Sequence, residues 1–232
     1  MKSFVITLKN HEYSNVVANR CIASGEQYNI VIEKFNAIHK NNAYATMESY
    51  GLNWSWAKNN TQRVKCPNTN LTQFPYTTSD LRTKIGCSMS HYLLWRKCVE
   101  LDEPILILEH DAVFLRPLPD ITFNGICQIN NPENATRNGK WWAKQMITRN
   151  INGTHEKTWA STANNRDIPD GLAGNSAYLI KPWAAQECID KFHTLGVWPN
   201  DATICKQLFP YLEEYYPFIT KVIQTHSTTI DD

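Results

Sequence analysis

The sequence predicts an α/β fold, with a mostly parallel sheet flanked by helices in a single domain over residues 1–232. Three observations predict this fold. Apolar runs of strand length alternate with helix-forming segments along the whole chain. The first two runs enclose a helical segment, and such a strand–helix–strand unit implies a parallel pair of strands. The chain has 232 residues, 42% of them hydrophobic, which is enough to bury a full core.

The N-terminal segment supplies the first strand–helix–strand unit. Phe4–Leu8 has strand composition, and Ser14–Ser24 can form a helix with Ser14 as its N-cap. Tyr28–Phe35 is the second expected strand. The polar segment Asn41–Asp80 is expected to form short helices and loop over one edge of the sheet.

A long helix and the most apolar strand follow. Thr83–Leu101 carries apolar side chains at helical spacing, and Asp102-Glu103-Pro104 stops it. Ile105–Leu108 is the strand that comes next, which completes a second crossover. Val113–Leu115 and Ile126–Ile129 are further strand candidates.

Residues 130–170 form a long insertion of low hydrophobicity, which is expected to be a lid or a binding loop. It contains Trp141, Trp142 and Trp159. Their aromatic faces either anchor the insertion to the body of the protein or stack on a sugar.

The C-terminal part returns to alternating strands and helices. Two glycines in Gly171–Ile180 lead into a buried strand, so a ligand can approach the backbone closely there. Helices are expected over Pro182–Phe192 and Asp201–Leu208, and the last strand over Tyr216–Gln224.

Composition excludes some partners. The net charge of +1 and the absence of a Lys/Arg cluster argue against nucleic-acid binding. No apolar run reaches transmembrane length, and Met1-Lys2 leads directly into a strand rather than a signal peptide. The seven cysteines contain no Cys-x-x-Cys pair, which is typical of reduced thiols in a cytoplasmic protein. Nothing in the sequence indicates an oligomeric state.

The strongest indication of a site is an aliphatic strand that ends in Glu109, His110 and Asp111. A buried carboxylate costs free energy unless it is paired or binds a metal. Residues i and i+2 of a strand point the same way, so Glu109 and Asp111 are expected to converge on one cation, with His110 on the opposite side. Oxygen ligands suit Mg²⁺ or Mn²⁺, which often bridge phosphates. The alternative is a strand that simply ends in a polar turn.

Other polar residues are expected at the same edge of the sheet, because ligands of such sheets bind beyond the carboxyl ends of the strands. Thr7 and Leu8 end the first strand, Asn36 follows the second, and His226 lies beyond the last.

The stretch Lys84–Trp95, followed by Ile107–Asp111, resembles glycosyltransferase family 25, which includes bacterial lipooligosaccharide and collagen galactosyltransferases. The family carries a Gly-Cys-x-x-Ser-His-x-x-x-Trp helix followed by Leu-Glu-Asp-Asp. Gly174–Ile180 is similar to its Gly-x-x-Ala-Tyr-Leu-Ile strand, and Pro199–Asp201 to its Pro-Val-Asp element. The chain departs from the family where His110 replaces the middle aspartate and where an asparagine precedes Asp201.

The resemblance implies a GT-A, Rossmann-like fold. It also implies transfer of a hexose, with galactose favoured, from a UDP-sugar to a glycan acceptor, with Mn²⁺ or Mg²⁺ and with inversion. The 130–170 insertion would then lie on the acceptor side. Two alternatives stay open: another donor sugar (glucose, rhamnose or xylose), or a catalytically silent carbohydrate-binding protein of the same fold.

The resemblance also implies roles for the residues at the site. Asp111 is the first metal ligand, Glu109 binds the metal, a metal-bound water or the ribose, and His226 is a further ligand unless it is an ordinary surface residue. Asp201 is the general base, with helix N-capping as its alternative role and Asp170 as the reserve base.

The remaining expected contacts are with the nucleotide sugar. Thr7, Leu8 and Asn36 would frame the nucleobase. Lys84 would contact phosphate or sugar unless it is an ordinary solvated lysine, and His110 is an additional candidate in this group. Ser90 and His91 are expected to form hydrogen bonds beneath the site.

Overall fold

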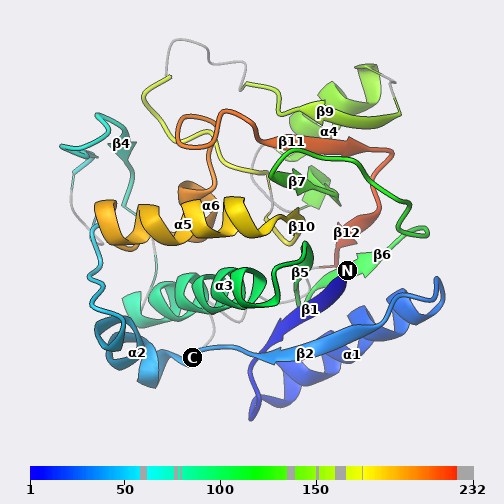
Figure 1. Ribbon diagram of the computed structural model, residues 1–232, viewed down its shortest axis with the longest axis horizontal. Coiled ribbons are helices and arrows are strands. Elements are labelled where there is room, and N and C mark those ends of the chain that lie inside the picture. The colour runs from blue at the N-terminus through cyan, green and yellow to red at the C-terminus, as the bar shows by residue number, and fades with distance from the viewer. Residues whose placement is uncertain are drawn as a thin grey trace.

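A seven-stranded mixed sheet forms the centre of the computed structural model, in the order β2-β1-β5-β10-β7-β11-β9 (Figure 1). The structure describes residues 1–57, 62–75, 78, 80–134, 139–149, 152–159, 166–173 and 175–223. β2, β1, β5, β7 and β11 share one direction, whereas β10 and β9 run antiparallel to their neighbours. The strands are β1 (Lys2–Thr7), β2 (Ile32–Asn36), β5 (Ile105–Glu109), β7 (Ile126–Gln128), β9 (Gly153–Glu156), β10 (Ala177–Ile180) and β11 (Glu213–Tyr216).

Two small sheets accompany the main one. The first has the order β6-β12-β8, and the second is the hairpin β3-β4. Their strands are β3 (Val64–Lys65), β4 (Thr72–Gln73), β6 (Ala112–Phe114), β8 (Asn130–Asn131) and β12 (Thr220–Val222).

Helices cover both faces of the main sheet, which confirms the predicted α/β class. Buried residues of α1 join the cluster on one face, and those of α2, α3 and α5 join the cluster on the other. α3 and α5 lie side by side in Figure 1. The helices are α1 (Glu12–Glu26), η1 (Lys40–Asn42), α2 (Ala43–Ser49), α3 (Leu81–Leu101), η2 (Pro132–Asn134), α4 (Gly139–Arg149), α5 (Pro182–Leu195) and α6 (Asn200–Thr203).

The chain order places a switch point between β1 and β5. β1 pairs in parallel with β2 on one side and with β5 on the other. The connection through α1 covers one face, whereas the connection that contains α3 covers the opposite face. In sheets of this kind ligands bind at the carboxyl ends of the strands beside the switch point. Those ends are Thr7 and Glu109.

Alternation along β5 separates the two halves of the core. Ile105 and Ile107 face α3 and α5, whereas Leu106 and Leu108 face α1, and all four are fully buried. Tyr178 on β10 lies on the α3 side, opposite Ile107 in the register. A strand that is apolar on both faces is the pattern from which the sequence predicted it.

Several predicted boundaries in the first half need correction. α1 begins at Glu12, and its N-cap is His11, whose side chain accepts from the Ser14 amide, so Ser14 is not the cap. Ser14 is buried instead, and its Oγ lies 3.0 Å from Thr7 Oγ1. β2 begins at Ile32, four residues later than predicted.

α3 begins two residues earlier than predicted, because Asp80 caps it by accepting from the Arg82 amide. It ends at Leu101, and its C-cap Asp102 has a left-handed φ of 50°. Lys84 is therefore inside the first turn of this helix.

The C-terminal third departs most from the prediction. The helix predicted over Asp201–Leu208 ends at Thr203, because Cys205 forms an antiparallel bridge with Gly171. The strand predicted over Tyr216–Gln224 is shorter and corresponds to β12, whereas β11 ends at Tyr216, before the cis Tyr216–Pro217 bond, and belongs to the main sheet. The 130–170 insertion contains η2, α4 and β9, and β9 extends the main sheet beside β11.

Candidate active site

Glu109 ends β5 at the switch point. Its amide donates to the Ser176 carbonyl at 2.8 Å, and Ser176 Oγ lies 3.4 Å from Glu109 Oε2. β10 therefore fixes both the backbone and one carboxylate oxygen of Glu109. By the alternation of β5, its side chain lies on the α3 side of the sheet.

His110 and Asp111 lie in a turn after β5, so strand alternation does not extend to Asp111 and was the wrong reason to pair it with Glu109. The two carboxylates nevertheless interact. Burial, and then the charge of Glu109, raise the pKa of Asp111 to about 7. Asp111 Oδ1 is buried and has no hydrogen-bond partner among the described residues.

α3 supplies the residues beneath Glu109. His91 Nε2 lies 3.5 Å from Glu109 Oε1, a long contact, and the His91 ring is completely buried. Burial alone would raise the pKa of Glu109. The interaction with His91, followed by the charges of His110 and Lys84, outweighs burial and holds that pKa below its usual value.

Cys87 lies one helical turn before His91 and connects this part of α3 to α6. Its Sγ donates to Asn200 Oδ1 at 3.6 Å, which joins α3 to α6. Burial, and then the charge of Glu109, raise the pKa of the Cys87 thiol to about 12. Lys84 opposes this shift, and Asp201 and Asp111 add to it. Four of the predicted site residues therefore act electrostatically on one thiol: Lys84, Glu109, Asp111 and Asp201.

Asp201 is an exposed carboxylate in α6. It is not the N-cap, because Pro199 holds that position and makes no side-chain cap. A Cβ on Gly171 would lie 1.9 Å from the Asp201 carbonyl oxygen, so only glycine permits this close approach. Asp170, the reserve base, is buried and accepts from Lys157 Nζ at 3.1 Å, so it is poorly placed to take up a proton.

The ends of β1 and β2 lie beside each other, with Thr7 opposite Asn36 in the register. The Thr7 side chain is buried against Ser14, whereas Asn36 is exposed and Leu8 is half-buried. Asn36 and Leu8 are therefore the two of this group that a ligand can reach.

The two histidines predicted for this edge differ. His110 is half-buried, and burial lowers its pKa, opposed by Glu109 and reinforced by His11 and Arg20. His226 lies outside the described residues.

The tryptophans of the insertion serve as anchors. Trp142 packs under Lys157, with Nζ 4.1 Å from the ring centroid, and meets Trp141 edge to face. Arg166 Cζ lies 3.9 Å above the ring of Trp159. These contacts match the structural alternative in the sequence prediction rather than an open sugar-stacking surface.

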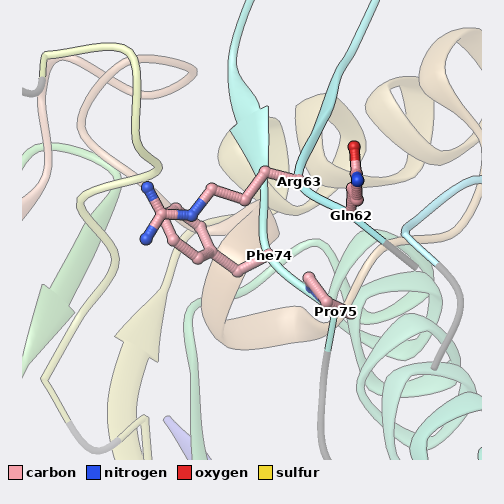
Figure 2. Close-up of a pocket in the computed structure, with 4 residues that line it drawn as sticks. All are labelled: Gln62, Arg63, Phe74 and Pro75. Atoms are coloured by element: carbon pink, nitrogen blue, oxygen red, sulfur yellow. The ribbon is translucent and has the colours of Figure 1, made fainter. Parts of the chain in front are cut away.

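A separate pocket opens on the β3-β4 side of the molecule. It is lined by Gln62, Arg63, Phe74 and Pro75, and Arg63 Cζ lies 4.3 Å over the Phe74 ring (Figure 2). None of these residues belongs to the carboxylate site. Among the described residues, its lining carries no acidic or nucleophilic side chain.

Two sets of side chains could hold a cation. Glu109 and Asp111 offer hard oxygen ligands, and the raised pKa of Asp111 and its unpartnered Oδ1 fit a carboxylate pair that a divalent cation would stabilise. Cys87, His91 and Glu109 form the second set, with ligand atoms within 4.8 Å of one another. Thiol and imidazole ligands favour Zn²⁺ over Mn²⁺ or Mg²⁺.

Sequence reasoning gave no role to Cys87, Tyr178 or Asn200. The spacing of Cys87 and His91, four residues apart on one helix, was a usable signal, because such residues share a face. Nothing local to Tyr178 indicates that its hydroxyl reaches His91, a residue 87 positions away.

Comparison with protein-family models identifies the family of the chain, and comparison with solved structures gives a distant likeness. Among solved structures, the chain is similar to the apo form of mouse xyloside xylosyltransferase 1, with 11% identity and a TM-score of 0.41 over 91% of this chain and 83% of that chain. No curated protein sequence matches it. A family model, glycosyltransferase family 25 (LPS biosynthesis protein), matches residues 1–204, which include Cys87, Glu109, Asp111 and Asp201. The chain therefore belongs to glycosyltransferase family 25 and is a glycosyltransferase.

Proposed function

We propose that this glycosyltransferase moves a hexose, with galactose favoured, from a UDP-sugar to a glycan acceptor with inversion. In this proposal Glu109 and Asp111 hold Mn²⁺ or Mg²⁺ at the end of β5, in a GT-A fold. The observation that carries the proposal is the buried, unpartnered Asp111 Oδ1 next to a second carboxylate at the switch point. Two buried carboxylates close together are destabilising without a cation, so their presence at the end of a buried strand favours a site that binds one.

The cation would neutralise the negative charge that develops on the diphosphate as its bond to the sugar breaks. Lys84 supports the same role, because it lies on the first turn of α3, close enough to affect both Glu109 and Cys87. A lysine at that position can bind a phosphate oxygen.

The nucleobase is assigned to the ends of β1 and β2. Asn36 is exposed and can offer both a donor and an acceptor to a uracil ring, and Leu8 offers an apolar contact. Thr7 supports them through its hydrogen bond with Ser14.

Asp201 is the proposed general base. It is exposed, so an acceptor hydroxyl can reach it, and it lies on α6 next to Asn200, whose side chain accepts from Cys87. Its carboxylate would take the hydroxyl proton as the acceptor oxygen attacks the anomeric carbon from the side opposite the leaving diphosphate. His226, in the segment after β12, is a proposed additional ligand.

The insertion and the cellular setting follow the same proposal. Residues 130–170 would form the acceptor side, because Lys157 holds Asp170 immediately before the Gly171–Asp201 contact.

All seven cysteines are free thiols, which supports a reducing compartment such as the cytoplasm. Among the described helices, none combines the length and apolar character needed to cross a bilayer.

Thermal unfolding with ligands tests the proposal. UDP and Mn²⁺ together should raise the melting temperature of the wild-type protein, because a ligand that binds only the native state stabilises it. Asp111→Asn should lose the Mn²⁺-dependent part of this shift. Asp201→Asn should keep the shift and lose transfer from UDP-galactose.

Asp120→Asn is the matched control, because Asp120 is an exposed carboxylate in the loop between β6 and β7. It should behave as the wild type in both assays. The proposal is wrong if no nucleotide stabilises the wild-type protein with or without Mn²⁺, or if Asp111→Asn responds to Mn²⁺ as fully as Asp120→Asn does.

A further inference from the structure

A buried chain of polar side chains leads to Glu109 from the interior. Trp95, Tyr178 and His91 are all completely buried on the α3 side of the sheet. Trp95 Nε1 lies 2.9 Å from Tyr178 Oη, and Tyr178 Oη lies 2.9 Å from His91 Nδ1. The other ring nitrogen, His91 Nε2, faces Glu109 Oε1 at 3.5 Å. An apolar core would be less costly, so this polar chain needs an explanation.

The direction of the chain follows from its first member. An indole N–H can only donate, so Tyr178 Oη accepts from Trp95. The buried Tyr178 hydroxyl proton then needs an acceptor. Within the described part of the chain, His91 Nδ1 is the other group that hydrogen-bonds to Tyr178 Oη.

The tautomer of His91 follows in turn. A neutral imidazole carries one proton, and a ring whose Nδ1 accepts must carry it on Nε2. His91 Nε2–H therefore lies beside the Glu109 carboxylate, 3.5 Å from Oε1, and makes no hydrogen bond of ordinary geometry within the described residues. The contact is longer than an ordinary hydrogen bond by a few tenths of an ångström, and such contacts often tighten when substrate binds.

We propose that Trp95, Tyr178 and His91 are positioning residues, which hold the Glu109 carboxylate in place through a one-directional hydrogen-bond chain that ends in a neutral His91 donor. This role rests on the proposed function, because it presumes that Glu109 helps to hold the cation that binds the diphosphate. Ser176 Oγ holds the second oxygen of Glu109 at 3.4 Å, so the two contacts together fix the plane of the carboxylate.

The same geometry argues against Zn²⁺ between Cys87, His91 and Glu109. A metal ligand must present an unprotonated nitrogen, whereas the chain places the proton on the nitrogen that faces Glu109. The Cys87 thiol is also engaged as a donor to Asn200 Oδ1 at 3.6 Å.

The first test is the tautomer of His91 in the wild-type protein. ¹⁵N NMR of the imidazole at neutral pH should show a protonated Nε2 and an unprotonated Nδ1. A proton on Nδ1, or a doubly protonated ring, would overturn the proposal. So would a thiolate-to-cobalt charge-transfer band on addition of Co²⁺ that disappears in Cys87→Ser.

The second test compares two tyrosine variants. Tyr178→Phe keeps the ring and removes the hydroxyl, so it should raise the dissociation constant for Mn²⁺ by about 10-fold or more, the usual effect of removing an outer-shell partner. It should also lower kcat while leaving KM for the acceptor unchanged. Loss of the Nε2–H tautomer in the NMR spectrum of the same variant should accompany these changes.

Tyr92→Phe is the matched control. Tyr92 is also buried, and its hydroxyl lies 3.3 Å from His193 Nε2, so the variant removes a similar tyrosine–histidine contact without touching His91 or Glu109. The proposal is overturned if both variants bind Mn²⁺ and transfer sugar like the wild type, or if both lose Mn²⁺ affinity equally. A wild-type protein that binds neither Mn²⁺ nor UDP would contradict the proposed function itself, whereas the wrong tautomer contradicts only the positioning chain.

Discussion

The charge of Asp111 is poorly compensated by the described residues around it. Its Oδ1 has no partner among the described residues, and its neighbour Glu109 is also acidic. The positive charge of Arg20 offsets this only in part. The free energy of folding should therefore depend on whether Asp111 is ionised.

Folding raises the pKa of Asp111, so this residue stabilises the protein more at low pH than at high pH. The pKa of Asp111 rises from an ordinary 3.8 to about 7 on folding, so the native state binds the proton more tightly. The stability from this group is fully present below about pH 4 and is lost as the pH rises through about 7. Without metal, Asp111→Asn should be more stable than the wild type at pH 8 by about 1 kcal/mol or more, since one pKa unit corresponds to about 1.4 kcal/mol.

Urea unfolding of both proteins at pH 4 and pH 8, with chelator present, measures this difference. It should shrink toward zero at pH 4 and reverse at pH 8 when Mn²⁺ is added. Asp120→Asn should show no such dependence. A wild-type protein that is equally or more stable than Asp111→Asn at pH 8 without metal would contradict the assignment.

At the scale of residues, local chemistry could be predicted and distant contacts could not. Glu109 and Asp111 stood out in the sequence because carboxylates interrupt an apolar run. The packing of Tyr178 against His91, 87 positions away, has no local signal. The family resemblance ranked Asp201 above Asp170 as the base, but only the fold shows that Lys157 holds Asp170 and that Asp201 is exposed.

At the scale of elements, prediction succeeded where the hydrophobic pattern was long. α3 and β5 were predicted to within two residues at each end, because many periodic side chains define them. The predicted extents of the Asp201–Leu208 helix and the Tyr216–Gln224 strand were wrong, because contacts between distant segments decide where α6 and β12 end. Cys205 pairs with Gly171, and β12 pairs with β6 and β8. Propensity over a few residues cannot outweigh such tertiary pairing.

Gly86 shows how one residue joins an element to the site. A Cβ at this position would lie 2.4 Å from the Ile38 carbonyl oxygen, which is a backbone atom. Ser90, one turn later, accepts from the Ile38 amide at 2.9 Å. Glycine therefore allows α3 to approach the segment that follows Asn36, and this contact sets the distance between the proposed nucleobase and diphosphate positions.

Gly86→Ala should destabilise the protein by about 1–3 kcal/mol, the usual effect of overpacking, despite the better helix propensity of alanine. Gly25→Ala in α1 is the control, because its Cβ would meet side-chain rather than backbone atoms: the movable Ile32 Cδ1 at 2.5 Å, and Ile32 Cγ1 and Phe114 Cε2 at 3.4 Å. That variant should unfold within about 1 kcal/mol of the wild type. Chemical denaturation measures the free energy of unfolding of both variants. Equal values would show that α3 can move away from Ile38 without cost.

At the scale of the whole molecule, the 130–170 insertion is built into the protein rather than attached to its surface. β9 extends the main sheet beside β11. Lys157 is completely buried, contacts Asp170 at 3.1 Å and lies against Trp142. Asp170 in turn precedes the glycine that packs on Asp201. The buried ion pair therefore connects the insertion to the proposed catalytic base.

Breaking this pair from one side should be costly. Lys157→Met leaves the Asp170 carboxylate buried without its cation and should lower the free energy of unfolding by about 3 kcal/mol or more. Lys65→Met is the control, because Lys65 pairs with Asp167 where the two side chains are 50% and 40% exposed, and a pair of that kind contributes less than about 1 kcal/mol. Adding Asp170→Asn to Lys157→Met should recover much of the loss, since the buried charge is then gone. Urea unfolding measures all three variants. If Lys157→Met costs no more than Lys65→Met, the insertion is held by its apolar contacts and strand pairing instead, and the transfer activity of Lys157→Met should then equal that of the wild type.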